Sequence, residues 1–232
     1  MKHYVITRFS AGINTQPVLP TVRNAPSAEE WFQHRLTLFE EYTASSMVAQ
    51  TAPFHWVLSV DPQTPRWVMN GLRSILKGVA HTVLPSDSYD HIPQVAWVAD
   101  QVRRDGGDRV IMTRLDSDDG LHRDYLEAVQ DIAKGFLGVI DLTRGIWLNH
   151  RTHIAQRVNK QGRPFVSLVE DCSKPLRGVF CAYHNRLAKK VGSVRRSDHA
   201  PPWLETFHEY NKASRARIDS GLPWSRLSGG FR

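Results

Sequence analysis

Short β-rich runs alternate with longer helical windows through the first 135 residues, and this alternation constrains the fold more than any other feature. Ser27 and Glu30 have the spacing of a capping box at the start of the first helical window. Four β–α units in succession predict an α/β fold, with a mostly parallel, buried central sheet flanked by helices. The expected strands are 3–9, 54–61, 81–85 and 108–116, and the expected helices are 27–50, 64–77, 92–104 and 123–135.

After residue 135 the pattern changes to closely spaced β-rich stretches, which predict an added antiparallel or mixed region. These stretches are 136–143, 145–150, 164–171 and 178–184. From about residue 193 the chain becomes basic, with one expected helix at 204–217. The pattern divides the chain into a domain at 1–192, with halves 1–126 and 127–192, and a basic C-terminal extension at 193–232.

Composition limits the partners and the compartment. A length of 232 residues can bury one large core. The formal net charge of +7 and the pI of about 9.6 suit nucleic acid, an acidic membrane surface or phosphorylated small molecules. Cys172 and Cys181 lack a CxxC spacing, which argues against a structural zinc site and favours a reducing cytoplasm. We expect no signal peptide and no membrane span, because no apolar run approaches ~18 residues.

An acidic cluster follows the expected strand at 108–116. A helix cap explains one of its carboxylates, a solvated loop conflicts with the apolar strand before it, and an EF-hand fails because Gly120 and Leu121 occupy positions that need other residues. Strand alternation instead places Asp116 and Asp118 on one side of the segment. Ligands bind at the carboxyl ends of strands in open α/β sheets. We therefore expect Mg²⁺ or Mn²⁺ to be held there together with substrate phosphates.

Several motifs occur in an order that resembles a known family. They are Thr7-Arg8-Phe9, then Trp31, Arg35, Leu38-Phe39-Glu40 and Gln50, then Trp56, Asp61, Thr64 and Pro65, and last Thr113 to Asp119 with its DXD triplet. Together they resemble GT-A-fold glycosyltransferases, and among these the rhamnosyltransferase family. The resemblance covers residues 4 to about 126 and implies that 1–126 binds a nucleotide-sugar, leaving 127–192 for the acceptor.

The resemblance also implies roles for individual residues of the first half. Arg8 and Asp61 would line the nucleotide pocket, although Asp61 can equally be a turn residue before Pro62. Asp116 would contact ribose or metal, and Asp118 the metal and diphosphate. Asp119 would orient the donor sugar or cap the next helix. Arg114 would contact the nucleotide-sugar or serve as a salt-bridge partner.

Candidates for the catalytic base and a further metal ligand lie in the second half. An inverting transfer needs a carboxylate that accepts the proton of the attacking hydroxyl. Glu170 and Asp171, at the end of a strand, are preferred over Glu205. The resemblance implies a late histidine as metal ligand, for which we select His199, with His184 as the alternative.

These observations predict a cytoplasmic, Mn²⁺- or Mg²⁺-dependent glycosyltransferase. It would move a sugar from a nucleoside-diphosphate sugar to a glycan, a lipid-linked sugar or a modified base in DNA, with peripheral membrane contact compatible with its charge. One alternative is a nucleotidyltransferase, although FSAGINTQP lacks the expected Gly-rich basic loop. Another is a basic nucleic-acid-binding module with a degenerate enzyme fold, which the intact DSDD disfavours.

Overall fold

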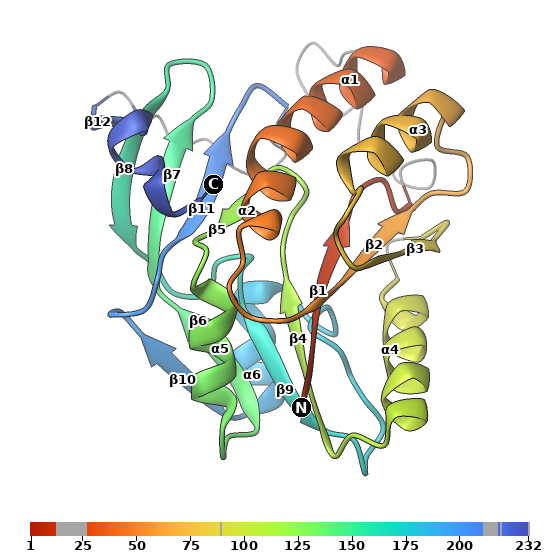
Figure 1. Cartoon of the computed structure of the whole chain (residues 1–232). Helices are drawn as coiled ribbons and strands as arrows, with labels where there is room; N and C mark the ends of the chain where they lie inside the picture. The colour runs from red at the N-terminus through yellow and green to blue at the C-terminus, as the bar shows by residue number, and fades with distance from the viewer. Residues whose placement is uncertain (13–26, 89, 211–217, 219, 232) are drawn as a thin grey trace.

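The computed structural model describes residues 1–12, 27–88, 90–210, 218 and 220–231. Within them, two sheets lie side by side: a seven-stranded sheet of order β10-β6-β9-β4-β1-β2-β3 and a five-stranded sheet of order β12-β8-β7-β11-β5 (Figure 1). The strands are β1 Lys2–Arg8, β2 His55–Val60, β3 His81–Pro85, β4 Arg109–Arg114, β5 Gly120–Leu121, β6 Gly138–Leu142, β7 Arg144–Asn149, β8 Ile154–Asn159, β9 Ser167–Asp171, β10 Val194–Ser197, β11 Trp203–Phe207 and β12 Leu222–Pro223. The helices are α1 Ala28–Leu38, the π-helix η2 Phe39–Ala44, α2 Ser45–Val48, α3 Arg66–Ile75, α4 Ile92–Asp105, α5 Tyr125–Ala133, α6 His184–Val191, and the 3₁₀ turns η3 Trp224–Arg226 and η4 Ser228–Gly230.

The direction of the strands confirms the expected fold class. β1 pairs in parallel with β2 and β4, β2 with β3, and β6 with β10. β9 is antiparallel to both of its neighbours, β4 and β6. The first half therefore builds a parallel sheet, and the second half adds the mixed strands that the sequence predicts.

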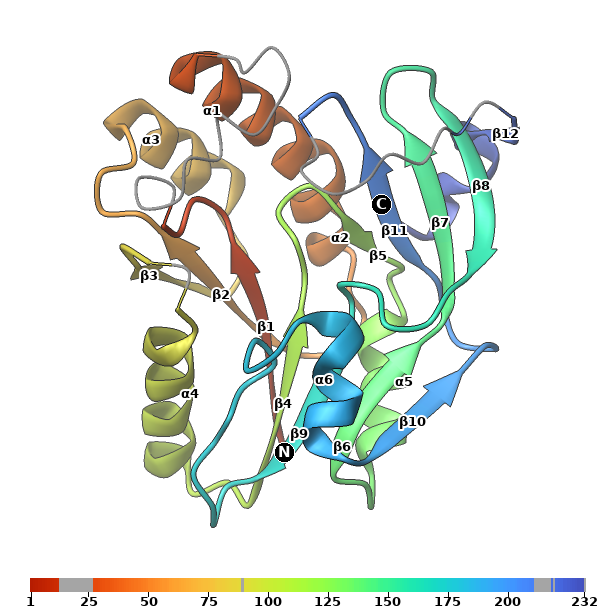
Figure 2. The ribbon, with the colours of Figure 1, turned by 180° about the vertical axis from the view of Figure 1, so that it is seen from behind.

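Helices cover both faces of the seven-stranded sheet because its strands are apolar on both sides. Val5 packs with residues of α1, α3 and α5, whereas its neighbour Ile6 packs with residues of α4 and α6. Figure 2 shows α6 in front of the sheet, with α5 behind it. The capping box at Ser27 and Glu30 is confirmed, with both reciprocal hydrogen bonds present (2.7 and 3.2 Å).

A tryptophan on β11 fixes the second sheet against the first. The indole of Trp203 stacks on Phe165 (4.7 Å between centroids), and its Nε1–H donates to the Leu142 carbonyl (2.8 Å). The ring lies directly over Gly145, so any larger side chain at that position would collide with it. This packing sets the position of β11 and of the residues that follow it.

Three expectations for the second half need correction. Residues 178–184 were expected to be a strand, but 178–183 form an irregular segment with turns and His184 begins α6. The helix expected at 204–217 is β11 over its first residues, and 211–217 lie outside the described residues. The expected extension from residue 193 contributes β10 and β11 to the two sheets, because β-rich stretches far apart in sequence pair there.

None of the helices in the described part of the chain has the length and apolar character needed to cross a bilayer.

Candidate active site

Charged residues follow three neighbouring strands at the carboxyl edge, the edge of the seven-stranded sheet where β1, β2 and β4 end. Arg8 ends β1, Asp61 follows β2, and the loop Asp116–Asp119 follows β4. They converge because β1 lies between β2 and β4 and runs parallel to both. Asp61 is buried, its N–H donates to Ser10 Oγ (3.1 Å), and its Oδ1 accepts from the Gln63 N–H (2.8 Å). Its carboxylate therefore shapes the turn at this edge.

Asp116 is paired with a cation from its own strand. Arg114 donates to both of its oxygens, through Nε and Nη2, at 3.1 Å each. The guanidinium of Arg114 lies 4.9 Å from the centroid of the Phe180 ring, and that of Arg8 lies 3.9 Å from the same ring. Two guanidinium groups on one aromatic ring concentrate positive charge beside Asp116.

Asp118 is a buried carboxylate held by two other elements. Its Oδ2 lies 3.0 Å from Arg35 Nη1 of α1 and 2.9 Å from His208 Nε2, just beyond β11. Burial alone would raise the pKa of Asp118, but the Arg35 guanidinium and the hydrogen bonds from His208 and Arg35 outweigh it and hold the pKa well below its usual value. Asp118 is therefore ionised.

Asp119 ties the acidic loop to the second sheet. Its Oδ1 accepts from the Thr206 N–H (2.9 Å), and Thr206 Oγ1 donates to the carbonyl of Asp118 (2.7 Å). Burial, followed by the charges of Asp118, Glu205 and Asp116, raises the pKa of Asp119 well above its usual value. Helix α5 begins at Tyr125 with Asp124 at the N-cap position, so Asp119 is not the helix cap.

Glu205 is a second buried carboxylate close to the acidic loop. It forms an ion pair with Arg163, and its Oε2 accepts from the indole Nε1–H of Trp147 (2.9 Å). Burial raises the pKa of Glu205, with Arg163 acting in the opposite direction. Glu205 and the acidic loop shift one another's pKa values, which indicates that their charges interact.

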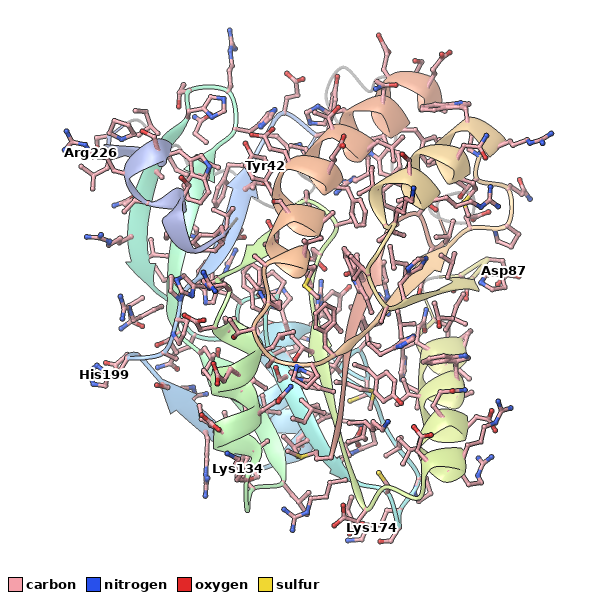
Figure 3. All side chains as sticks on the ribbon, viewed as in Figure 1. Tyr42, Asp87, Lys134, Lys174, His199 and Arg226 are labelled. Atoms are coloured by element: carbon pink, nitrogen blue, oxygen red, sulfur yellow. The ribbon has the colours of Figure 1, made fainter. Side chains whose placement is uncertain are left out.

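Glu170 and Asp171, the preferred base candidates from the sequence, lie at the opposite edge of the sheet. β9 runs antiparallel to β4, so these two residues pair with Val110 and Arg109 at the start of β4. Glu170 Oε1 and Oε2 accept from the N–H groups of Arg177 (3.0 Å) and Gly178 (2.9 Å). Lys174, three residues beyond Asp171, marks this lower end of the molecule in Figure 3. The structure does not bring the pair together with the acidic loop, because a strand end points to the site only when the strand runs parallel to β4.

The histidines are arranged differently from the sequence prediction. The side chain of His199 is 95% exposed on the loop between β10 and β11 and projects outward in Figure 3. His184 lies at the start of α6, where its Nδ1 is 2.5 Å from the Gly162 carbonyl. His208, which sequence reasoning missed, contacts Asp118 instead. The signal that could have found it is its position directly after the stretch 203–207, which forms β11, whereas 204–217 was expected to be a helix.

The acidic loop offers only part of a ligand set for the expected Mn²⁺ or Mg²⁺. Among the described residues, no three His, Cys, Asp or Glu side chains are grouped closely enough to hold a metal ion by themselves. Asp116 and Asp118 nevertheless offer two carboxylates at a strand end, and such a pair binds Mg²⁺ when substrate phosphates complete the coordination. The donor set fits a cation that arrives with a diphosphate.

A family described as "Putative rhamnosyl transferase" matches residues 2–220 of the sequence. No curated protein matches it.

Several solved structures are similar to the chain at low identity. A cytidylyltransferase from Leptospira borgpetersenii has 10% identity over 86% of this chain and 76% of its own, with a TM-score of 0.45. A "putative nucleotide-diphospho-sugar transferase" from Desulfovibrio desulfuricans has 14% identity over 98% and 94%, with a TM-score of 0.44. A mannosyltransferase from Pyrobaculum calidifontis in complex with GDP-Man and Mn²⁺ has 15% identity over 61% and 35%, with a TM-score of 0.35. The sequence match, rather than these likenesses, relates the chain to a family.

Proposed function

The chain belongs to the rhamnosyl transferase family and is a nucleotide-sugar-dependent transferase, and from this premise we propose that it moves a sugar from a nucleoside-diphosphate sugar at the carboxyl edge to an acceptor hydroxyl. One observation carries the proposal. The ionised Asp118 and its neighbour Asp116 follow β4 where β1 and β2 also end, and cations from three elements surround them. Ligands of open α/β sheets bind at this edge.

The cations next to the acidic loop suit the diphosphate of the donor. Arg8 and Arg114 share the Phe180 ring, and planar guanidinium groups bind phosphate oxygens through two parallel N–H donors. Asp61, buried beside the end of β1, would accept hydrogen bonds from the base or the ribose. Asp119 would orient the donor through its link to Thr206.

We assign the cation, Mn²⁺ or Mg²⁺, to Asp116 and Asp118. A bound divalent ion would neutralise the charge that develops on the departing diphosphate. Arg114 and Arg35 already oppose these two carboxylates, so they keep the site close to electrical balance and leave guanidinium groups near the phosphates. His208, which hydrogen-bonds Asp118, takes the place beside the acidic loop that the sequence prediction gave to His199.

For the catalytic base we propose Glu205 in place of Glu170 and Asp171. Glu205 lies on the second sheet near Asp116 and Asp119, and a carboxylate of raised pKa is a better proton acceptor than an ordinary one. Trp147 and Arg163 fix its orientation. The acceptor would approach over this second sheet. The net charge of +7 favours a negatively charged glycan or lipid-linked sugar over a neutral one. DNA is the alternative acceptor among nucleic acids.

A thermal-shift panel tests the proposal. UDP-, GDP-, dTDP- and CMP-sugars would be added with and without Mn²⁺ to the wild type, to Asp118→Asn and to Glu170→Gln as the matched control. A donor present at about 100 times its dissociation constant stabilises a protein by roughly 2.7 kcal/mol.

We expect a metal-dependent shift with one nucleotide class in the wild type and the control, and none in Asp118→Asn. Equal shifts in all three proteins would place the donor away from Asp118. No shift with any donor, together with an affinity for DNA that is the same in the wild type and in Asp118→Asn, would favour the nucleic-acid-binding alternative.

A further inference from the structure

We propose that one edge of the second sheet binds the protein to an anionic membrane surface. This surface, the basic edge, comprises the β7–β8 hairpin, the residue that follows it and the turn η3 beyond β12. None of its cations belongs to the donor site. The five cations are exposed: Arg144, Arg151, Arg157, Lys160 and Arg226.

The two segments that form the basic edge contain cations and no acidic residue. Residues 142–169 contain five Lys or Arg and no Asp or Glu, and residues 220–231 contain Arg226 and no Asp or Glu. The whole chain, by contrast, has 23 acidic residues for 30 Lys and Arg. The excess positive charge of the protein is therefore concentrated in these segments.

The cations of the basic edge are not paired with neighbouring carboxylates. None of the five forms an ion pair with a described residue, whereas Arg163, in the same stretch, pairs with Glu205. On α4, Arg103 and Arg104 both pair with Asp100. The positive potential of the basic edge is therefore available to an external anion.

Strand pairing brings three of the cations together at one end of the hairpin. Arg144 lies opposite Asn159, two residues beyond Arg157, so Arg144 and Arg157 share a face of the hairpin as diagonal neighbours. Such neighbours are about 7–8 Å apart. The Lys160 N–H donates to the Thr143 carbonyl (2.8 Å), which places Lys160 next to Arg144.

The other two cations lie at the opposite end of the hairpin. The Trp224 N–H donates to the His153 carbonyl (2.9 Å), so η3, with Arg226, lies against the turn that carries Arg151. Figure 3 shows Arg226 at the outer side of the molecule, beside β8 and β12. Leu222 of β12 is 39% exposed there. The basic edge thus combines five cations with an apolar side chain that can enter the headgroup layer.

These features suit a membrane better than a nucleic acid. A two-stranded ribbon can enter the major groove of DNA, but β7 is also paired with β11, so the hairpin is part of a wider sheet. Proteins that bind single strands stack bases on aromatic rings. Within the described part of these two segments no Trp or Phe is fully exposed: Trp147 is half-buried, and Trp224 is buried.

The basic edge lies beside the surface over which the acceptor would approach. β7 separates β8 from β11, the strand that carries Glu205. A protein bound through this edge would hold Glu205 close to the membrane, which favours a lipid-linked sugar among the acceptors. This last step rests on the proposed function, whereas the membrane-binding surface does not.

The test is sedimentation of the full-length protein with vesicles, at low and high salt and without donor or metal. Vesicles of phosphatidylcholine alone would be compared with vesicles that also contain phosphatidylglycerol. The edge variant is Arg144→Gln/Arg157→Gln/Lys160→Gln. The matched control, Arg73→Gln/Arg103→Gln/Arg104→Gln, removes the same charge from α3 and α4, which lie on the far side of the molecule in Figures 1 and 2.

We expect the wild type and the control to bind the anionic vesicles at low salt, to release them at high salt, and to ignore phosphatidylcholine. Each Lys or Arg near an anionic bilayer strengthens binding by about 5-fold, so the edge variant should bind about 100-fold more weakly. Hydrogen–deuterium exchange of the wild type, which needs no variant, should show protection by anionic vesicles at 144–160 and none in α4.

Three results would overturn the inference. They are no binding of the wild type to anionic vesicles at low salt, an equal loss in the edge variant and the control, or protection away from 144–160. Tighter binding to a DNA duplex than to the vesicles, lost in the edge variant, would assign the surface to nucleic acid instead. Because these measurements need no donor, failure of the proposed function would be seen separately, in the thermal-shift panel.

Discussion

Two acidic stretches of the seven-stranded sheet can be compared: the loop Asp116–Asp119 after β4 and the pair Glu170–Asp171 at the end of β9. At the carboxyl edge, the carboxylates are held by cations and a histidine from α1, β4 and the segment after β11. At the opposite edge, Glu170 accepts from the N–H groups of Arg177 and Gly178 in the loop that follows it. The first arrangement gathers distant elements around a charge, whereas the second stabilises a local loop.

The difference between the two edges comes from strand direction. β4 runs parallel to β1 and β2, so its end shares an edge with theirs, whereas β9 runs the other way. The two acidic stretches look alike in sequence, and only the pairing separates them. Substitutions at the carboxyl edge should therefore affect donor binding and turnover, whereas substitutions at the opposite edge should affect stability alone.

Glu205→Gln should have the largest effect on turnover. Removing a general base lowers kcat by about 10²- to 10⁴-fold, while the amide keeps the shape of the side chain and leaves donor binding in place. Release of the nucleoside diphosphate and donor calorimetry would separate the two quantities. A normal kcat in Glu205→Gln would remove Glu205 from the reaction.

Asp118→Asn should lose both donor binding and stability. We expect kcat/KM to fall by about 10²- to 10³-fold, as when a preorganised electrostatic group is lost. The free energy of unfolding should also fall by roughly 3 kcal/mol, because Arg35 would be left as an unpaired cation whose side chain is only 14% exposed. Urea unfolding measures the second effect, and an unchanged donor affinity would contradict the first.

Glu170→Gln should lower stability without changing activity. The Arg177 and Gly178 N–H groups would lose a charged acceptor, which costs about 1–3 kcal/mol for hydrogen bonds of this kind. Urea unfolding checks the loss. Reduced turnover at unchanged donor KM would mean that the opposite edge takes part in catalysis.

Asp171→Asn should have the smallest effect. The carboxylate accepts from the Ser173 N–H (2.9 Å), and the amide oxygen of asparagine can still do so. The thermal midpoint should move less than in Glu170→Gln, and the rate of donor turnover should stay at the wild-type value. A loss of turnover here would restore Asp171 as a base candidate.

The parallel half of the fold could be predicted because its apolar periodicity and its capping box are local properties. Four residues of the site could also be grouped from the sequence, because each ends or follows a strand of one parallel set: Arg8, Asp61, Asp116 and Asp118. His208 and Thr206 could not, because their contacts with the acidic loop span about 90 residues and depend on how β11 packs through Trp203. The sequence prediction put Glu170 at the edge with the acidic loop, because nothing in the local sequence indicates that β9 pairs with β4 in the antiparallel direction.

Hydrogen–deuterium exchange tests most directly whether the donor site lies at the carboxyl edge. It would be measured in the presence of Mn²⁺, with and without the nucleoside diphosphate whose sugar derivative stabilises the protein in the thermal-shift panel. We predict that the nucleotide slows exchange in peptides that contain Arg8–Ser10, Asp61–Thr64 and Asp116–Asp119, and leaves peptides from Glu170 to Gly178 unchanged. Protection of 170–178 with no change at the carboxyl edge would contradict this placement of the donor site.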